Sequence, residues 1–274
     1  MIAYPAMLDV SRELVGYVAA LLRRERKARG TRKNTRVLTC WFQSVFVIAW
    51  FRDRPEIARH GRAFGLSQAT AYRYLHEAID VLADQAPDLH QALQRAAEHR
   101  IPHLILDGKV FDTDRCRTKT ISVKGDQIDA WYAGKTHDFG GNVQALFEPD
   151  GFPIWTSDVE PGGVVDIQAA RKHVLPAAYP AARTMPILAD PGYQGAGHGI
   201  HTPFKQPASG NVLSIDNRTY NTLQRALRCL GERGFALLTG RWKTLRQTTL
   251  SPSRIGDIVR AALVLVHFEH GRIT

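Results

Sequence analysis

The chain has 274 residues, of which 44% are hydrophobic and 23% are charged. These proportions are typical of globular proteins and exclude wholesale disorder, and the length predicts one large domain or two ordinary ones. The formal net charge of +10 favours a polyanionic partner such as nucleic acid. No apolar run approaches the roughly 18 residues that a membrane span needs, and the N-terminus lacks a signal-peptide pattern. We therefore expect a soluble cytoplasmic protein with no membrane partner.

Residues 1–100 have the pattern of a mainly helical region. The segment 22–36, LRRERKARGTRKNTR, is strongly basic and contains a single acid, Glu25. Such a run is either a solvated helix end and loop or a surface that contacts phosphate groups. Residues 37–51, VLTCWFQSVFVIAWF, are apolar on nearly every side, which predicts a buried helix.

Residues 56–83 predict two helices joined by a tight turn. A short helix reaches Phe64, Gly65 supplies the turn, and Ser67 is suited to cap the second helix. This is the outline of a helix-turn-helix, whose second helix enters the major groove of DNA, although helical hairpins that do not touch DNA share it. If the unit binds DNA, we expect three side chains near the start of the second helix to contact bases: Gln68, Thr70 and Arg73.

Residues 103–274 alternate between short apolar runs and helical segments. The segments 103–108 and 185–193 each predict a short buried strand that ends in an acid, followed by a glycine in the first and by Pro-Gly in the second. Residues 143–158 predict a hairpin around Pro149-Asp150-Gly151. Helices are expected at 164–175, 220–245 and 254–268. This alternation predicts an α/β fold with a mixed sheet, whose ligand sites lie beyond the carboxyl ends of the strands.

Asp107 and Asp190 each close one of these apolar runs, at the point where the chain is expected to leave the sheet. Two carboxylates brought together repel each other, which raises one pKa or recruits a divalent cation. Oxygen ligands suit Mg²⁺ or Mn²⁺. The alternative is that each residue only forms a turn, ahead of Gly108 in one case and of Pro-Gly in the other.

The helix predicted at 220–245 supplies a third acid. Four polar residues follow one another there at spacings that place them on one helical face: Asn221, Arg225, Arg228 and Glu232. We expect this face to project into a cleft that holds metal and phosphate, while leucines on the other faces pack on the sheet. The alternative is a solvated face with a weak Arg228–Glu232 salt bridge.

Six segments in register resemble one known family. In chain order they are GLSQATAYRYLHEAIDVLA (65–83), LDGKVFDTDR (106–115), YAGKTH (132–137), PGGVVD (161–166), LADPGYQGAG (188–197) and N-x3-R-x2-R-x3-ER (221–233). On these motifs the chain resembles the DDE superfamily endonucleases and transposases of bacterial insertion sequences. Within them it is similar to the insertion-sequence-five-like group, which has an N-terminal helix-turn-helix and is related to Harbinger-type transposases.

The resemblance implies a ribonuclease H-like catalytic domain. The three catalytic acids of the family carry over to Asp107, Asp190 and Glu232. The same three side chains are implied to hold Mg²⁺ or Mn²⁺, with two ions in each active site.

Further positions match the family outside these acids. Lys135, Arg225 and Arg228 are implied to contact DNA phosphates, the lysine as a point charge and the arginines through two hydrogen bonds each. Asp166 matches the family's Pro-Gly…Asp element, where we favour helix N-capping over metal ligation.

We therefore expect an all-α helix-turn-helix domain at 1–100 that binds DNA, followed by a ribonuclease H-like catalytic domain at 101–274. The expected function is transposition, with metal-dependent cleavage of DNA strands at transposon ends and strand transfer into target DNA. The expected partners are double-stranded DNA, as terminal inverted repeats and as target, and a second copy of the chain in a homodimer on DNA. The expected location is the bacterial cytoplasm, in association with the nucleoid. Two alternatives stay open: a helix-turn-helix regulator with a non-catalytic transposase-derived domain, and a nuclease of the same fold without strand transfer.

Overall fold

The computed structural model describes residues 8–114, 116–122, 125–207 and 212–273, except for the side chain of Glu232. The N-terminal part is helical, as predicted, and its helices in the described residues are α1 (Arg12–Ala28), α2 (Cys40–Asp53), α3 (Ile57–Ala63), α4 (Gln68–Ala83) and α5 (Leu89–Glu98). Thr39 caps α2, which is buried along most of its length. Its first turn is not, because Trp41 and Phe42 are 37% and 55% exposed.

The predicted pair of helices at 56–83 forms with the expected local signals. Phe64 ends α3, Gly65 has a φ of 70°, and the Ser67 hydroxyl accepts a hydrogen bond from the Thr70 amide at the start of α4. A positive φ is the conformation that glycine adopts at least cost. The local geometry is therefore confirmed, and a role of this unit in DNA binding stays a prediction.

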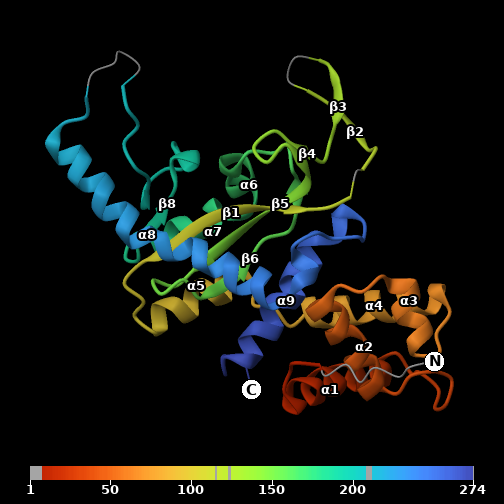
Figure 1. Ribbon diagram of the computed structural model, residues 1–274. Helices are drawn as coiled ribbons and strands as arrows, with labels where there is room; N and C mark the ends of the chain where they lie inside the picture. The colour runs from red at the N-terminus through yellow and green to blue at the C-terminus, as the bar shows by residue number, and fades with distance from the viewer. Residues whose placement is uncertain (1–7, 115, 123–124, 208–211, 274) are drawn as a thin grey trace.

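A mixed sheet forms the centre of the second half of the chain (Figure 1). Its main strands are β5 (Asp138–Phe147), β1 (Leu104–Asp112), β8 (Ile187–Ala189) and β9 (Ile200–His201), adjacent in that order. β1 runs antiparallel to β5 and parallel to β8, and β8 runs parallel to β9. The short strands β4 (Tyr132–Ala133), β6 (Pro153–Thr156) and β7 (Glu160–Pro161) also pair with β5. This arrangement confirms the predicted α/β class with a mixed sheet and is consistent with a ribonuclease H-like fold.

The hairpins and shorter helices flank this sheet. β5 and β6 form the predicted hairpin, with Gly151 at a φ of 86° in its turn. A separate two-stranded hairpin, β2 (Lys119–Ile121) with β3 (Gln127–Asp129), stands out from the sheet in Figure 1. The helices α6 (Asp166–His173) and α7 (Leu175–Ala182) precede β8. Short 3₁₀ turns follow β8 (Pro191–Tyr193) and lie at Lys243–Leu245 and Pro252–Arg254.

The long helix α8 (Ile215–Arg241) crosses the sheet and contacts β1 and β8. It begins five residues earlier than predicted and ends before residue 245. Two glycines permit the close approach: a side chain on Gly231 would lie 2.7 Å from Ile105, and one on Gly234 would lie 2.2 Å from Phe147. The prediction that all its leucines pack on the sheet is wrong for Leu223 and Leu227, which are 61% and 51% exposed. In this part of α8 the side chain that faces the sheet is instead Gln224, which is 3% exposed and hydrogen-bonds to the carbonyls of Ala189 and His201.

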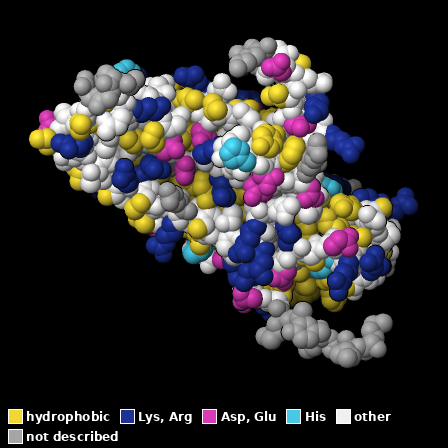
Figure 2. Space-filling view, turned by 45° about the horizontal axis from the view of Figure 1, so that its top comes forward, with side chains coloured by type: hydrophobic (Ala, Val, Ile, Leu, Met, Phe, Trp, Pro, Cys, Tyr) yellow, Lys and Arg dark blue, Asp and Glu magenta, His cyan; other side chains and the backbone are white. Residues whose placement is uncertain are grey.

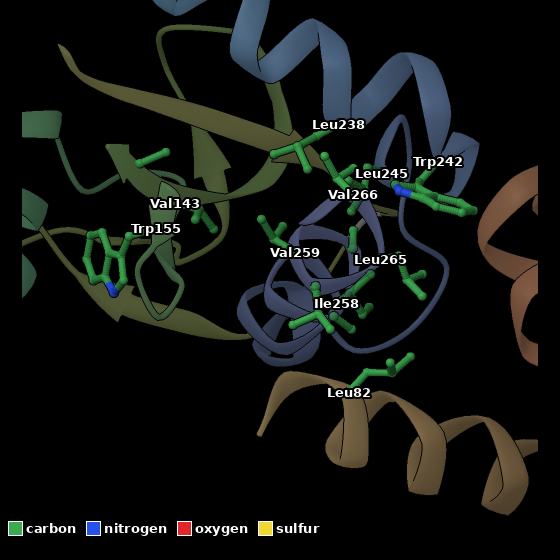
Figure 3. Close-up of a cluster of buried hydrophobic side chains, with 14 of the residues drawn as sticks. Leu82, Val143, Trp155, Leu238, Trp242, Leu245, Ile258, Val259, Leu265 and Val266 are labelled. Carbon is green, nitrogen blue, oxygen red and sulfur yellow. The ribbon is translucent and has the colours of Figure 1, made fainter. Parts of the chain in front are cut away.

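The last helix, α9 (Ile255–Glu269), joins the two parts of the molecule. It lies between the sheet and the N-terminal helices (Figure 1) and packs against α4. Figure 3 shows Leu82 of α4 beside Ile258 of α9, with Trp242 and Leu245 on the other side of the helix. The buried apolar side chains form one continuous cluster from α1 to α9. The division at residue 100 stays a prediction.

The positive charge is not gathered in one patch on the face that Figure 2 displays. Figure 2 shows Lys and Arg side chains spread across the face that it displays, with acidic side chains between them. None of the helices in the described part of the chain is long and apolar enough to cross a membrane.

Candidate active site

Asp107 and Asp190 lie side by side at the edge where β1 and β8 stop pairing. The last residues of that parallel pair are Leu106 and Ala189, so the residue that follows in the sequence is in each case one of the two acids. Asp190 leaves the sheet, as predicted, and caps a 3₁₀ turn by accepting a hydrogen bond from the Gly192 amide at 2.7 Å. The prediction that the strand also ends at Asp107 is wrong. β1 continues to Asp112 because the longer strand β5 still pairs with it.

The surroundings of Asp107 make its negative charge costly. Burial is the largest effect and raises the pKa of its carboxyl from 3.8 to about 6. The Gly108 amide, which donates a hydrogen bond to Oδ1 at 2.9 Å, opposes the rise, and the charge of Asp190 adds to it. Arg228 and Lys135 lower the pKa through their positive charges. Asp107 and Asp190 therefore repel each other, and the charges of Arg228 and Lys135 oppose that repulsion.

The polar residues predicted on one face of α8 have different surroundings in the structure. Arg228 lies close enough to Asp107 to affect its pKa, and its buried Nε has no hydrogen-bond partner among the described side chains. Arg225 is exposed. Asn221 does not face the carboxylates, because its amide exchanges two hydrogen bonds with the backbone of Phe204, at 2.8 and 2.9 Å. Position 232 lies one turn beyond Arg228 on α8, and the Glu232 side chain lies outside the described part of the chain.

Gln224 is a site residue that the sequence did not reveal. Its buried Nε2 donates to the carbonyl of Ala189 at 2.8 Å and to that of His201 at 3.0 Å. The first of these carbonyls directly precedes Asp190, so Gln224 ties α8 to the end of the strand that carries the acid. The only signal in the sequence is its spacing of four from Arg228, which helix packing also produces.

Asp166 does not cap a helix, contrary to our prediction. It is the first residue of α6, and the capping position belongs to Val165, which makes no side-chain hydrogen bond there. The Asp166 carboxylate instead accepts hydrogen bonds from Lys135 Nζ at 3.0 Å and from Asn142 Nδ2 at 2.8 Å. The helix therefore begins one residue earlier than capping by Asp166 would require, so that Val165 occupies the capping position and Asp166 is free to bind residues distant in sequence.

Lys135 reaches the same region as the two acids. It is exposed and lines an open cleft of about 500 Å³ together with Asp166 and Asp190. Burial alone would lower the pKa of Lys135, but the hydrogen bond to Asp166 and the charges of Asp166, Asp190 and Asp107 raise it above the usual value. The structure thus brings together Asp107, Asp190, Lys135 and Arg228 from the predicted site.

The three predicted base-contacting residues form a separate group on α4, which Figure 1 places far from β8. Gln68 and Arg73 are exposed, and Thr70 is half-buried. The Thr70 hydroxyl accepts hydrogen bonds from the Ser67 hydroxyl at 3.0 Å and from Arg73 Nη2 at 2.9 Å. The start of α4 is therefore a polar, accessible helix end, although Arg73 is partly engaged within it.

The basic segment 22–36 is partly used inside the fold. Glu77 of α4 is a buried carboxylate that pairs with Arg36 and receives a hydrogen bond from Gln43. Other arginines of the segment also have intramolecular partners, namely Arg24 with Gln85, Arg26 with Gln43 and Arg29 with Glu25. Both interpretations of this segment, a solvated helix end or a phosphate-binding surface, left out these intramolecular contacts.

The donors at the site fit a divalent metal ion. Among the described side chains, no three of His, Cys, Asp and Glu gather closely enough to hold an ion. Two carboxylates do meet at Asp107 and Asp190, and burial raises the pKa of Asp107, so a bound cation would offset the cost of its negative charge. Paired carboxylate oxygens are the donor set that Mg²⁺ and Mn²⁺ prefer.

Comparison with known proteins agrees with this geometry. The family model described as DDE superfamily endonuclease matches residues 106–267, more than half of the chain and the whole region that carries the site. No curated protein matches the chain. A crystal structure of the Mos1 strand transfer complex aligns over 89% of this chain and 98% of that one, with 9% identity and a TM-score of 0.21, a level of similarity that carries no argument. On the family match, the chain belongs to the DDE superfamily of endonucleases.

Proposed function

We propose that this protein is a transposase that cleaves DNA strands at transposon ends and transfers them to target DNA, with Asp107, Asp190 and Glu232 as its catalytic acids. The observation that carries the proposal is the pair of adjacent, partly buried carboxylates on β1 and β8 within the region that matches the endonuclease family. Glu232 is added from the family resemblance and from its place on α8, one turn after Arg228.

The three acids would hold two Mg²⁺ or Mn²⁺ ions. Such ions, when bound, polarise the scissile phosphate and activate the water or 3′-hydroxyl that attacks it. The chain's own residues prepare the site. The Gly108 and Gly192 amides orient the carboxylates of Asp107 and Asp190, and Gln224 fixes the carbonyl before Asp190.

Basic side chains around the acids would bind the DNA backbone. Lys135 lines the cleft beside Asp190, and Arg225 and Arg228 project from α8. Their contacts would be to phosphate groups, which makes the affinity strongly dependent on salt but independent of sequence.

Sequence recognition is assigned to the helical region at 1–100. Gln68, Thr70 and Arg73 at the start of α4 would contact bases of the terminal inverted repeats, in the manner of a recognition helix. Residues 101–274 would then form the catalytic domain. Since two transposon ends must be held together, we propose a homodimer on DNA, in a bacterial cell and associated with the nucleoid.

The test is cleavage of a labelled duplex that carries the sequence flanking the gene, with Mg²⁺ or Mn²⁺ against EDTA. We expect metal-dependent nicking at the element end, lost in Asp107→Asn, Asp190→Asn and Glu232→Gln while DNA binding persists. Asp216→Asn, which changes an exposed acid on the first turn of α8, is the control and should nick normally. Tight DNA binding with no cleavage in either metal would refute the proposed enzymatic activity and favour a DNA-binding regulator. Nicking without joining to target DNA would leave a nuclease without strand transfer.

A further inference from the structure

A chain of hydrogen-bonded side chains lies below the cleft and ends at Lys135. Its links are Tyr193 hydroxyl to Gln144 Oε1 at 2.6 Å, Gln144 Nε2 to Asn142 Oδ1 at 2.9 Å, Asn142 Nδ2 to Asp166 Oδ1 at 2.8 Å, and Lys135 Nζ to Asp166 Oδ2 at 3.0 Å. Three of the five residues are almost fully buried in the protein, with exposures of 0% for Tyr193 and Gln144 and 2% for Asn142. Asp166 and Lys135 bring the chain to the surface of the cleft.

The direction of every link follows from the chemistry of Asp166. An ionised carboxylate only accepts hydrogen bonds, so Asn142 must present its NH₂ group to Asp166. Its carbonyl then faces Gln144, whose own carbonyl is left to accept from Tyr193. A phenol has one hydrogen to donate, so Tyr193 closes the chain. This set of buried groups is therefore satisfied in one arrangement, which fixes the carboxylate of Asp166 in place.

The same hydrogen-bonded side chains pack against the residue after Asp107 and include the last residue of the turn that Asp190 caps. A side chain on Gly108, the residue after Asp107, would lie 2.4 Å from Gln144 Nε2 and 2.5 Å from Asp166 Oδ1. Tyr193 ends the 3₁₀ turn that Asp190 begins. The position of Asp166, and of the ammonium group that it holds, is thus set relative to the two carboxylates.

We propose that Asp166 is a positioning residue, which holds the Lys135 ammonium in the cleft where it meets a phosphate of the bound DNA strand, and that Asp166 is not itself a metal ligand. The inference rests on the proposed function. Lys135 is 64% exposed at its side chain, whereas Asp166 is only 11% exposed. A long, exposed lysine would otherwise lose much rotamer freedom on binding phosphate, and the anchored carboxylate removes that loss before the DNA arrives.

The test is a double-mutant cycle on DNA affinity, measured in EDTA with the duplex that carries the gene's flanking sequence. Removing the negative charge by Asp166→Asn would tighten DNA binding if charge alone mattered. Positioning predicts the opposite sign, a weakening of roughly three- to tenfold. Lys135→Ala should weaken binding by at least as much, and Asp166→Asn should have no further effect in the Lys135→Ala background.

The chain offers a matched control. Lys172 pairs with Glu160 at side-chain exposures of 64% and 12%, nearly those of the proposed pair. Glu160→Gln and Lys172→Ala should show no coupling in DNA affinity. Circular dichroism and thermal unfolding check that each variant is folded. If Asp166→Asn does not fold, Tyr193→Phe removes a single hydroxyl from the other end and should weaken binding only while Lys135 is present.

Three outcomes would overturn the inference. The first is that Asp166→Asn binds DNA as tightly as the wild type or more tightly. The second is that Asp166→Asn lowers the DNA affinity equally with and without Lys135, because the carboxylate would then act independently of the lysine. The third is that the wild-type protein does not bind the duplex at all, which would contradict the proposed function and, with it, the phosphate contact of Lys135. Normal wild-type binding separates the first two outcomes from the third.

Discussion

Replacing Asp107 by Asn should make the metal-free protein more stable at neutral pH. The carboxyl has a folded pKa of about 6 against a usual value of 3.8, a difference that corresponds to about 3 kcal/mol. Below about pH 4 the group is protonated in both folded and unfolded chains, so it costs nothing. Between pH 4 and pH 6 the unfolded chain ionises first and folding loses stability. Above pH 6 the full penalty is present, and the substitution removes it.

Urea unfolding of the two proteins in EDTA measures this difference. At pH 7.5 we expect Asp107→Asn to raise the free energy of unfolding by about 2–3 kcal/mol, or the Tm by roughly 5–10 °C, and at pH 4.5 the gain should be much smaller. The exposed control Asp216→Asn should show no such gain. Addition of Mn²⁺ should stabilise the wild type and not the variant, since the ion compensates the charge that the variant lacks. A variant no more stable than the wild type at pH 7.5, or an equal gain at both pH values, would refute the reasoning.

Three further substitutions test the packing around the site and the N-terminal helices. Tyr193→Phe leaves the buried amide oxygen of Gln144 without a donor and should cost about 1–3 kcal/mol in urea unfolding, and an unchanged midpoint would show that the hydrogen bond does not form. Gly108→Ala places a methyl group 2.4 Å from the Gln144 amide nitrogen and should cost about 1–3 kcal/mol with loss of nicking, so a fully stable variant would contradict the tight contact. Glu77→Ala leaves the Arg36 guanidinium without its carboxylate and should lower stability by about 2–3 kcal/mol at pH 7, whereas an unchanged Tm would indicate that the pair contributes nothing.

The features that sequence predicted correctly depend on local patterns. Gly65 and Ser67 carry turn and capping preferences that act within a few residues, so the α3–α4 unit follows from its own segment. Asp107 and Asp190 each follow an apolar run, and parallel pairing of two such strands places the residues after them together. Periodicity and end signals are therefore sufficient to predict the strands that precede the two acids and the helices at 56–83, but not where β1 and α8 end.

The features that it missed depend on partners distant in the chain. Asp166 meets Lys135 across 31 residues, and Gln224 meets Ala189 across 35. Strand β1 continues past Asp107 only because β5 is long enough to pair with it. A partner distant in sequence also explains why Arg36 of the basic segment is not free at the surface, since it pairs with Glu77 on α4. Residue type gives no indication of such partners until the chain is folded.

The most direct test of the carboxylate pair is diffraction from crystals soaked in Mn²⁺, recorded for the anomalous signal of the metal. We predict a peak about 2.0–2.3 Å from carboxylate oxygens of both Asp107 and Asp190, and its loss in crystals of Asp107→Asn. A well-ordered site with no peak between the two acids, at Mn²⁺ concentrations that support DNA nicking, would contradict the assignment of these residues as the metal-binding centre.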